Sequence, residues 1–430
     1  MEWKKEIKIF IYLAVAFILF YNLPIGNQRF DGAIFEALEL MKWYAQEHVI
    51  LCLLPAFYIA GAIGVFVSQN SVMKYLGPKA NKKMAYGVGS VSGSILAVCS
   101  CTVLPIFTGI YMMGAGLGPA IAFLYSGPAI NVLAIILSGK VLGIEIAVAR
   151  TVGAVSFAIV IGLIMAFIFR KEEIKKIEAA AELPEPETPR PLWQTIIFFG
   201  LMIIILVFSN WAKPDTVEGF WFAVYSSKWI ITSVAALIFG IVLALWYKAN
   251  IIKLVAIAAI VAVSVFIFDN PSIPFGVAIL GLTYITITGN DELKKWFEST
   301  WTFAKQIMPL LFIGVLFAGF MLGRPGHEGI IPSVWISDLV GGNSLFANFI
   351  SSIIAAFMYF ATLTEVPILQ GLMGSGMGKG PALALLLAGP ALSLPSMLVI
   401  KSVIGTKKTV IYVSLVVFFS TIVGFIFGLI

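Results

Sequence analysis

Charged side chains are scarce in this chain: Asp, Glu, Lys and Arg make up 12% of its 430 residues, about half their share in soluble domains. Histidine occurs twice, as His48 and His327, both at predicted outer membrane boundaries, which makes a poor case for a metal site or a catalytic base. The sequence also lacks a Walker A loop, a GxSxG elbow, an HExxH helix and a dinucleotide fingerprint. We therefore expect neither an enzyme nor a cofactor, and we do not expect ATP-driven transport by this chain alone.

Cysteine is equally rare. The three cysteines, Cys52, Cys99 and Cys101, all fall in apolar segments, and so few exclude an extracellular disulfide framework. Polar loops never reach domain length, so no soluble catalytic domain is expected. The isoelectric point near 9.0 does not indicate a nucleic-acid partner, because the basic residues are scattered between apolar runs, where they set membrane topology.

Apolar sequence is what the chain has in abundance: 60% of its residues are hydrophobic and the mean hydropathy is +1.00. Long apolar runs predict about ten helices of roughly 20 residues in a lipid bilayer. The first run has a basic start but no small-residue cleavage site after it, so we expect it to be retained. The predicted spans are 8–24, 47–68, 118–138, 141–169, 193–210, 229–247, 252–268, 273–289, 301–322, 380–400 and 409–430.

The chain contains an internal repeat of 27 residues that aligns without a gap. Residues 105–131 and 367–393 are identical at 13 of 27 positions. The repeated unit breaks helices inside apolar sequence, which a membrane tolerates only where the backbone lines a cavity or is buried in protein. Paired broken segments in two halves of a chain indicate a transporter's binding site. The helix breakers are Pro105, Gly127 and Pro128 in the first copy and Pro367, Gly389 and Pro390 in the second.

Two further stretches, 84–114 and 345–376, are either long kinked spans or re-entrant hairpins. Basic residues decide between these alternatives. With a cytoplasmic N-terminus and two hairpins, most Lys and Arg residues fall on the cytoplasmic side; if 84–114 crosses fully, the basic run 170–176 moves outside. The hairpin interpretation is favoured, and it gives the two repeats opposite orientations in the membrane.

The predicted fold is therefore an all-α polytopic membrane protein with about ten to eleven transmembrane helices and two re-entrant hairpins in inverted-topology repeats. The charged, Pro-rich segment after the first repeat is predicted to be a cytoplasmic linker. The expected parts are 1–46 (a terminal span and outer loop), 47–170 (first repeat), 171–192 (linker), 193–290 (a four-span scaffold) and 301–430 (second repeat).

The tip of the first hairpin carries Cys99, Ser100, Cys101 and Thr102. Ser100 or Thr102 can cap the second arm, which places both thiols at a half-helix N-terminus. Two soft thiols two residues apart suit Cu(I), As(III) or Sb(III), or disulfide exchange. The alternative is that they pack as small hydrophobes. Cys52 is a candidate third thiolate.

The tip of the second hairpin carries Thr364 and Glu365, with Glu365 at the position of Val103 in the first repeat. An acidic side chain within a membrane span indicates a functional site, because burying it in the bilayer costs free energy. Glu365 is either a charged cation site or a neutral proton shuttle. Alternatively it only caps the free N–H groups of the second arm.

Other polar residues lie beside the two proline kinks, among them Asn131 and Ser393 as candidate substrate contacts. Arg150 lies in the first half of a long span. It is either an intramembrane cation, poised for an anionic substrate or for Glu365, or it snorkels to the outer interface near Glu145.

At the first repeat the chain resembles the predicted-permease superfamily that contains ArsP-type organoarsenical efflux permeases. The resemblance implies an inner-membrane secondary permease, with trivalent arsenicals as one family substrate. Two features depart from the family pattern: Thr102 follows the C-S-C where Gly is common, and TLTEVP occupies the second tip. The matching residues are Cys99, Ser100, Cys101, Pro105, Gly114, Gly118, Pro128, Ala129 and Asn131.

The sequence thus predicts a multi-pass permease of the plasma membrane in which Cys99 and Cys101 hold a soft substrate or metalloid and Glu365 couples its release to protonation. Two alternatives stay open. One is transport of a small sulfur-containing anion with Arg150, and the other is a membrane thiol–disulfide redox protein. Whether the chain forms a homo-oligomer is also open.

Overall fold

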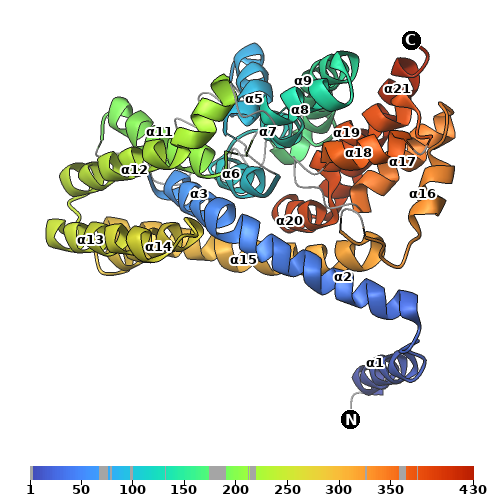
Figure 1. The fold of residues 1–430 in the computed structure, drawn as a ribbon, viewed down its shortest axis with the longest axis horizontal. Coiled ribbons are helices and arrows are strands. Elements are labelled where there is room, and N and C mark those ends of the chain that lie inside the picture. The colour runs from blue at the N-terminus through green and yellow to red at the C-terminus, as the bar shows by residue number, and fades with distance from the viewer. Residues whose placement is uncertain are drawn as a thin grey trace.

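A computed structural model describes residues 3–66, 76–77, 80–96, 100–130, 132–173, 190–211, 213, 219–324, 327–357, 365–374 and 376–430. Apart from two isolated backbone bridges, the described part of the chain is helical (Figure 1). The first ten helical elements are α1 (Trp3–Tyr21), α2 (Gln28–Tyr44), η1 (Ala45–Leu53), α3 (Leu54–Phe66), α5 (Lys82–Leu96), α6 (Ser100–Met112), α7 (Leu117–Ala129), α8 (Val132–Val141), α9 (Ile144–Ile168) and α11 (Leu192–Ser209). They are followed by α12 (Phe220–Trp246), α13 (Ile251–Ile267), α14 (Ser272–Ile287), α15 (Asp291–Leu322), α16 (Ser333–Leu339), α17 (Leu345–Phe357), α18 (Glu365–Gly374), α19 (Lys379–Leu392), α20 (Leu394–Ile404) and α21 (Thr406–Phe427).

The second predicted span is longer than expected. Helix α2 continues through the π-helical η1 into α3, so one 39-residue helix runs from Gln28 to Phe66. The outer loop predicted before residue 47 is therefore wrong. The π segment has a local cause: Pro55 has no N–H for the Leu51 carbonyl, which instead accepts a hydrogen bond of 2.7 Å from Asn210 Nδ2.

Five described helices are long and apolar enough to cross a membrane, or six if one bent pair counts as a single span. This is fewer than the ten to eleven predicted, because several other apolar helices have only 10–17 described residues, among them α13, α14 and α17. The bent pair is α19 and α20, which meet at 47°. The kink predicted within 380–400 is thus present, and the break falls at Ser393, three residues after Pro390.

The two repeats keep the same helix boundaries under one constant shift. The shift is 262 residues, from Pro105 to Pro367 (367 minus 105). It carries α7 onto α19, α8 onto α20 and the start of α9 onto the start of α21, within one residue where both bounds are described. Equivalent glycines also share a left-handed backbone: Gly114 and Gly376 in the turns, and Gly143 and Gly405 before the last helices. The duplication therefore extends well beyond the 27-residue segment.

Helix crossings are repeated in the same register. A Cβ built on Gly162 of α9 would lie 2.6 Å from the Gly118 carbonyl oxygen of α7. A Cβ on Gly424 of α21 would lie 2.6 Å from the Gly380 carbonyl oxygen of α19. Each pair of residues is related to the other by the 262-residue shift. Both crossings need glycine because the two backbones touch.

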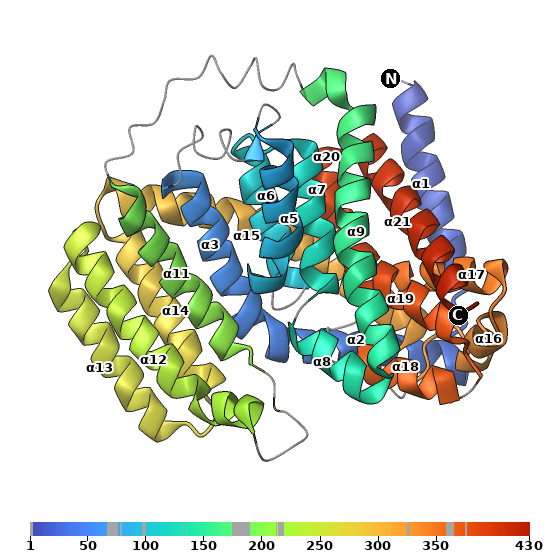
Figure 2. The ribbon, with the colours of Figure 1, turned by 90° about the horizontal axis from the view of Figure 1, so that it is seen from above.

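The helices that begin the two repeats pack antiparallel. A Cβ on Gly61 of α3 would lie 2.7 Å from the Thr300 backbone nitrogen of α15, and one on Gly319 would lie 2.8 Å from Ala37 Cα of α2. Ala37 precedes Gly61 along the chain, but its contact Gly319 follows Thr300, which is the contact of Gly61. The two helices therefore run in opposite directions. Helices α11–α14 gather on one side of this pair, and the hairpin helices gather on the other (Figures 1 and 2).

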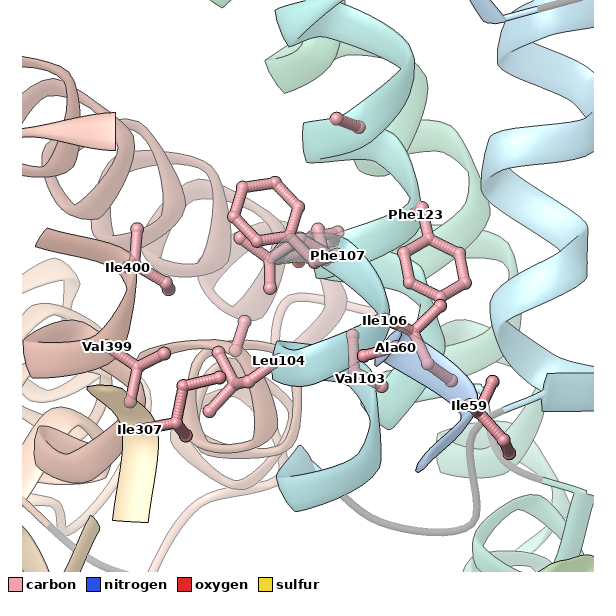
Figure 3. Close-up of a cluster of buried hydrophobic side chains, with 14 of the residues drawn as sticks. Ile59, Ala60, Val103, Leu104, Ile106, Phe107, Phe123, Ile307, Val399 and Ile400 are labelled. Carbon is pink, nitrogen blue, oxygen red and sulfur yellow. The ribbon is translucent and has the colours of Figure 1, made fainter. Parts of the chain in front are cut away.

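The buried apolar core extends to the hairpin of the first repeat. Leu104 of α6 is buried beside Ile307 of α15 and Val399 of α20, and Val103 is buried on the side of Ala60 of α3 (Figure 3). Because α20 belongs to the second repeat, this core joins the two repeats.

Candidate functional site

Several predicted site residues lie at the hairpin tips or at a helix break. Cys99, Asn131 and Thr364 are outside the described residues. Ser100, Cys101 and Thr102 form the first turn of α6, where only the backbone is described. The described part of α6 begins at Ser100, so Pro105, its sixth residue, lies beyond the first described turn of the helix.

Helices α6 and α18, which the sequence predicts as the second arms of the two hairpins, each contact the broken span of the opposite repeat. Helix α6 packs against α20, and α18 packs against α8. These two contacts are equivalent under the 262-residue shift. Each hairpin arm therefore faces the half-helix that follows the other repeat's proline break, and the hairpins bring both halves of the chain together.

Arg150 of α9 lies at the break between α7 and α8. Its Nε donates a 2.8 Å hydrogen bond to the carbonyl oxygen of Ala129, the last residue of α7. Its Nη1 donates a 3.1 Å hydrogen bond to Ser138 Oγ on α8. The C-terminus of α7 has a partial negative charge, which favours a guanidinium group. Pro128 ends α7 where Arg150 can reach its last carbonyl group.

The third contact of Arg150 is Glu365, the first described residue of α18. Arg150 Nη2 lies 3.3 Å from Glu365 Oε1 and 3.5 Å from Oε2, and both side chains are at most 1% exposed. The hypothesis that Arg150 is poised for Glu365, rather than snorkelling to the surface, is confirmed. Glu145, its expected partner at the surface, instead pairs with Lys379 at 3.0 Å.

The Arg150–Glu365 contact is longer than a typical charge-assisted hydrogen bond of about 2.7–2.9 Å. Only Glu365 Oε2 is in hydrogen-bond geometry with Nη2, and Oε1 has no hydrogen-bond partner among the described residues. A buried carboxylate with a spare oxygen can take up a proton or accept a donor from a ligand. The pair is thus a chemically incomplete site.

Ser393 lies at the second break and does not join this pair. It is buried, and its hydroxyl oxygen lies 2.7 Å from Ser396 Oγ. Because Pro395 follows, the chain cannot continue α19 directly into α20. In the described contacts Ser393 therefore stabilises the bend of the second repeat, whereas Arg150, from another helix, binds the end of α7 at the break of the first repeat.

The two repeats have equivalent helices, but the side chains at the positions of the charged pair differ between them. Under the 262-residue shift, Tyr412 stands in place of Arg150, Val103 in place of Glu365 and Ile400 in place of Ser138. Each of these replacements is uncharged. The charged pair therefore exists once, at the tip of the second hairpin, and the equivalent place at the first tip is part of the apolar core (Figure 3).

Sequence reasoning missed Ser138 and Glu173. Ser138 looked like one of many small residues near the end of a span. Glu173 belongs to a charged run assigned to the linker, yet it is 5% exposed. Glu173 Oε2 accepts a 3.0 Å hydrogen bond from Leu117 N at the start of α7, and Oε1 lies 3.4 Å from Lys408 Nζ of α21. The first residues of the predicted linker thus belong to the folded core.

Three charged residues on or just after α9 contact the second repeat. Glu145 and Arg150 lie in the first two turns of α9, which is 25 residues and about 37 Å long, and Glu173 lies five residues beyond its last residue, Ile168. The three ion pairs are Glu145–Lys379, Arg150–Glu365 and Glu173–Lys408.

Metal binding by the described side chains has no support in their geometry. Within the described ranges, no group of three or more His, Cys, Asp or Glu residues is close enough to hold a metal ion. The predicted soft-metalloid ligands Cys99 and Cys101 are not part of that set, because their side chains are not described.

Comparison with known proteins identifies the family. The model of the ArsP_1 family, described as predicted permease, matches residues 34–429. The chain belongs to this family. The resemblance inferred from the C-S-C segment is thereby confirmed, and a permease family implies a transporter rather than an enzyme.

Similar proteins occur in one archaeon and two bacteria. The UPF0718 protein MJ0584 of Methanocaldococcus jannaschii is 42% identical over 393 residues, which cover 90% of this chain and 93% of the relative. The UPF0718 protein YraQ of Escherichia coli is 29% identical over 134 residues, 30% of this chain and 36% of the relative. The UPF0718 protein YcgR of Bacillus subtilis is 26% identical over 120 residues, 27% of this chain and 40% of the relative. No solved structure matches the chain.

Proposed function

We propose that this permease is a secondary transporter that moves a small solute through a buried site between its two repeats. The observation that carries the proposal is the Arg150–Glu365 pair, which is fully buried and joins α9 of one repeat to the hairpin arm α18 of the other. Burying two charges in a membrane protein is costly, and a structural role alone is met as well by apolar packing. The pair therefore marks the transport site.

The repeats are proposed to lie in the membrane in opposite orientations, with one hairpin entering from each side. Two observations support this arrangement. The helices that begin the repeats pack antiparallel, and each hairpin arm contacts the broken span of the other repeat. Relative motion of the two repeats would then expose the shared site to one side of the membrane at a time.

The proposed substrate is a thiophilic species such as trivalent organoarsenic, moved outward. Membership of the predicted permease family and the C-S-C at the start of α6 support this substrate class. Thiolates of Cys99 and Cys101 would hold the soft arsenic atom. Protonation of Glu365 would remove its attraction for Arg150, which stays anchored to Ala129 and Ser138.

Export of methylarsenite tests the proposal. Cells without arsenic efflux systems of their own are expected to gain resistance from the unaltered chain. They should lose that resistance with Cys99→Ser/Cys101→Ser and with Glu365→Gln. Cys52→Ser tests the candidate third thiolate, because Cys52 lies in η1, which packs against α6; retained resistance would leave Cys99 and Cys101 as the two thiol ligands. Full resistance in the double Cys99/Cys101 variant would remove the thiol mechanism.

One observation favours a second candidate, the transport of a small anion. Arg150 is a fully buried guanidinium whose contact with Glu365 is long, so an anionic substrate can displace the carboxylate. In that case sulfur-anion uptake should survive loss of the thiols and should be abolished in Arg150→Ala. Uptake that is unaffected by Arg150→Ala would contradict this candidate.

A further inference from the structure

Two ion pairs join the first repeat to the second near opposite ends of α9. At the start of α9, Glu145 Oε2 lies 3.0 Å from Nζ of Lys379, the first residue of α19. Beyond the end of α9, Glu173 Oε1 lies 3.4 Å from Nζ of Lys408, the third residue of α21. The two repeats are therefore held together by charge at both ends of this helix.

The two ion pairs occupy equivalent places in the duplicated fold. Under the 262-residue shift, the start of α19 corresponds to the start of α7, and the start of α21 corresponds to the start of α9. Lys379 corresponds to Leu117, whose N–H group donates to Glu173 Oε2 at 3.0 Å. Glu145 corresponds to Lys407, which lies in the first turn of α21 beside the lysine that pairs with Glu173. In both places the helix before the break in one repeat is tied to the last helix of the other repeat.

Burial distinguishes the two ion pairs. The side chains of Glu145 and Lys379 are 69% and 60% exposed, and we call this pair the exposed contact. Those of Glu173 and Lys408 are 7% and 13% exposed, and we call this pair the buried contact. Tyr111, near the end of α6, donates a further 3.3 Å hydrogen bond to Glu173 Oε1. Exposed ion pairs are weak, whereas a buried, hydrogen-bonded pair is costly to break, so the exposed contact opens more easily.

The Arg150–Glu365 site lies close to the exposed contact. Arg150 follows Glu145 by five residues on the same helix (150 minus 145), a rise of about 8 Å. Ile168 ends α9, 18 residues (168 minus 150) and about 27 Å beyond Arg150. On the other side of the site, Lys379 begins α19, which packs against α18, the helix of Glu365. Both members of the exposed contact therefore belong to helices at the site.

We propose that the exposed contact is the gate through which a solute reaches the Arg150–Glu365 site, and that the buried contact closes the opposite end. This inference rests on the proposed function, in which the charged pair marks the transport site. When the exposed contact breaks, the starts of α9 and α19 can separate and open the site at that end. The buried contact holds the repeats together meanwhile. Release on the other side of the membrane requires the reverse, with the exposed contact formed and the buried contact broken.

Labelling of a cysteine at the site tests the gate without any transport. Ser138→Cys, in an otherwise cysteine-free full-length chain, places a thiol beside Arg150 with little change in size. An impermeant methanethiosulfonate reagent should label it slowly while the gate is intact. Glu145→Gln should raise the labelling rate by about two- to fivefold, the range that the loss of one exposed ion pair gives. Glu145→Lys places two like charges at the gate and should raise the rate further, and Glu145→Lys/Lys379→Glu should restore slow labelling.

The side of the membrane and a matched control complete the test. Intact cells and inside-out vesicles present opposite faces, and the rate should rise only from the face that also labels Glu145→Cys. Glu328→Gln is the matched control, because it removes another exposed ion pair, to Arg29 at 3.0 Å, that involves neither α9 nor α19. It should leave the rate unchanged. Val366→Cys, buried beside Glu365, is the second reporter if thermal melts show that Ser138→Cys does not fold.

The possible results separate the gate from the proposed function. Labelling that is equally fast with the intact gate, with Glu145→Gln and with Glu145→Lys would overturn the gate, and methylarsenite export would still decide the proposed function. A rise that Lys379→Glu does not reverse would also overturn the gate, because the charge of the pair would then not matter. Failure of export, together with labelling controlled by the exposed contact, would overturn the proposed substrate and leave the gate standing.

Discussion

At the residue scale, the proposed transport chemistry of this permease depends on one buried cation and one buried carboxylate. Arg150 is fixed by the Ala129 carbonyl and by Ser138, whereas Glu365 is held only by Arg150 among the described residues. The cation is thus the fixed partner and the acid the exchangeable one. This division suits a cycle in which Glu365 changes its protonation state or its partner while Arg150 stays in place.

Removal of Arg150 alone should be much more harmful than neutralisation of the whole pair. Arg150→Ala leaves a buried, unpaired carboxylate and should lower the free energy of unfolding by about 3–5 kcal/mol. The double variant Arg150→Ala/Glu365→Gln removes that charge and should recover a large part of the loss. Denaturation in mild detergent measures both. A double variant no more stable than Arg150→Ala would contradict the inference that Glu365 is charged beside Arg150.

A second contrast concerns the two ion pairs on either side of Arg150 along the chain, Glu145–Lys379 and Glu173–Lys408. Glu173 is 5% exposed and accepts hydrogen bonds from the α7 backbone and from Lys408. Glu173→Ala is therefore expected to destabilise the protein by about 2–3 kcal/mol. The side chains of Glu145 and Lys379 are 69% and 60% exposed, and Glu145→Ala should cost less than about 1 kcal/mol. The same unfolding measurement checks both, and equal losses would contradict the assigned roles.

At the element scale, the repeat is built from short helices that meet at glycines and end at prolines. The backbone contacts of Gly162 with Gly118 and of Gly424 with Gly380 hold α7 to α9 and α19 to α21 at fixed heights. The prolines end α7 and α19 where the opposite hairpin arrives. The close glycine crossings and the helix ends at the prolines together place α6 and α18 against the other repeat.

Added methyl groups at these crossings should be poorly tolerated. Gly162→Ala or Gly424→Ala places a Cβ 2.6 Å from a carbonyl oxygen, so the helices must move apart, at a loss of about 1–3 kcal/mol. Gly200→Ala in α11 is the matched control, because no atom lies within 4 Å of its Cβ position. It should be neutral or slightly stabilising. Thermal stability in detergent separates these outcomes, and a neutral Gly162→Ala would refute the crossing.

At the scale of the whole molecule, the proposed transport mechanism requires the two repeats to face opposite sides of the membrane. Met112 and Gly374 are equivalent under the 262-residue shift, and both are exposed at the ends of the hairpin arms. In a cysteine-free background, an impermeant maleimide should label Gly374→Cys in intact cells. It should label Met112→Cys only in inside-out vesicles. Labelling of both from the same side would refute the inverted arrangement.

Features set by neighbouring residues could be predicted from the sequence, whereas contacts between residues far apart in the chain could not. The helix breaks follow from local proline and glycine chemistry, so they were predicted to within a few residues. The polar residues of α2 suggested a loop, but Glu36 pairs with Arg324 at the far end of α15, a contact that no local pattern reveals. The Arg150–Glu365 contact spans 215 residues and appeared in the sequence only as one of two alternatives. Ser138 and Glu173 gave no signal that separated them from their neighbours.

The two repeats keep one register over their described helices, so the chain resembles a dimer joined end to end in which each partner contributes one member of the charged pair. The pair occurs once because the equivalent positions hold Tyr412 and Val103. Exchanging Arg150 with Tyr412 and Glu365 with Val103 would place the pair at the equivalent position only together with an exchange of Ser138 and Ile400, because Ser138 holds Arg150.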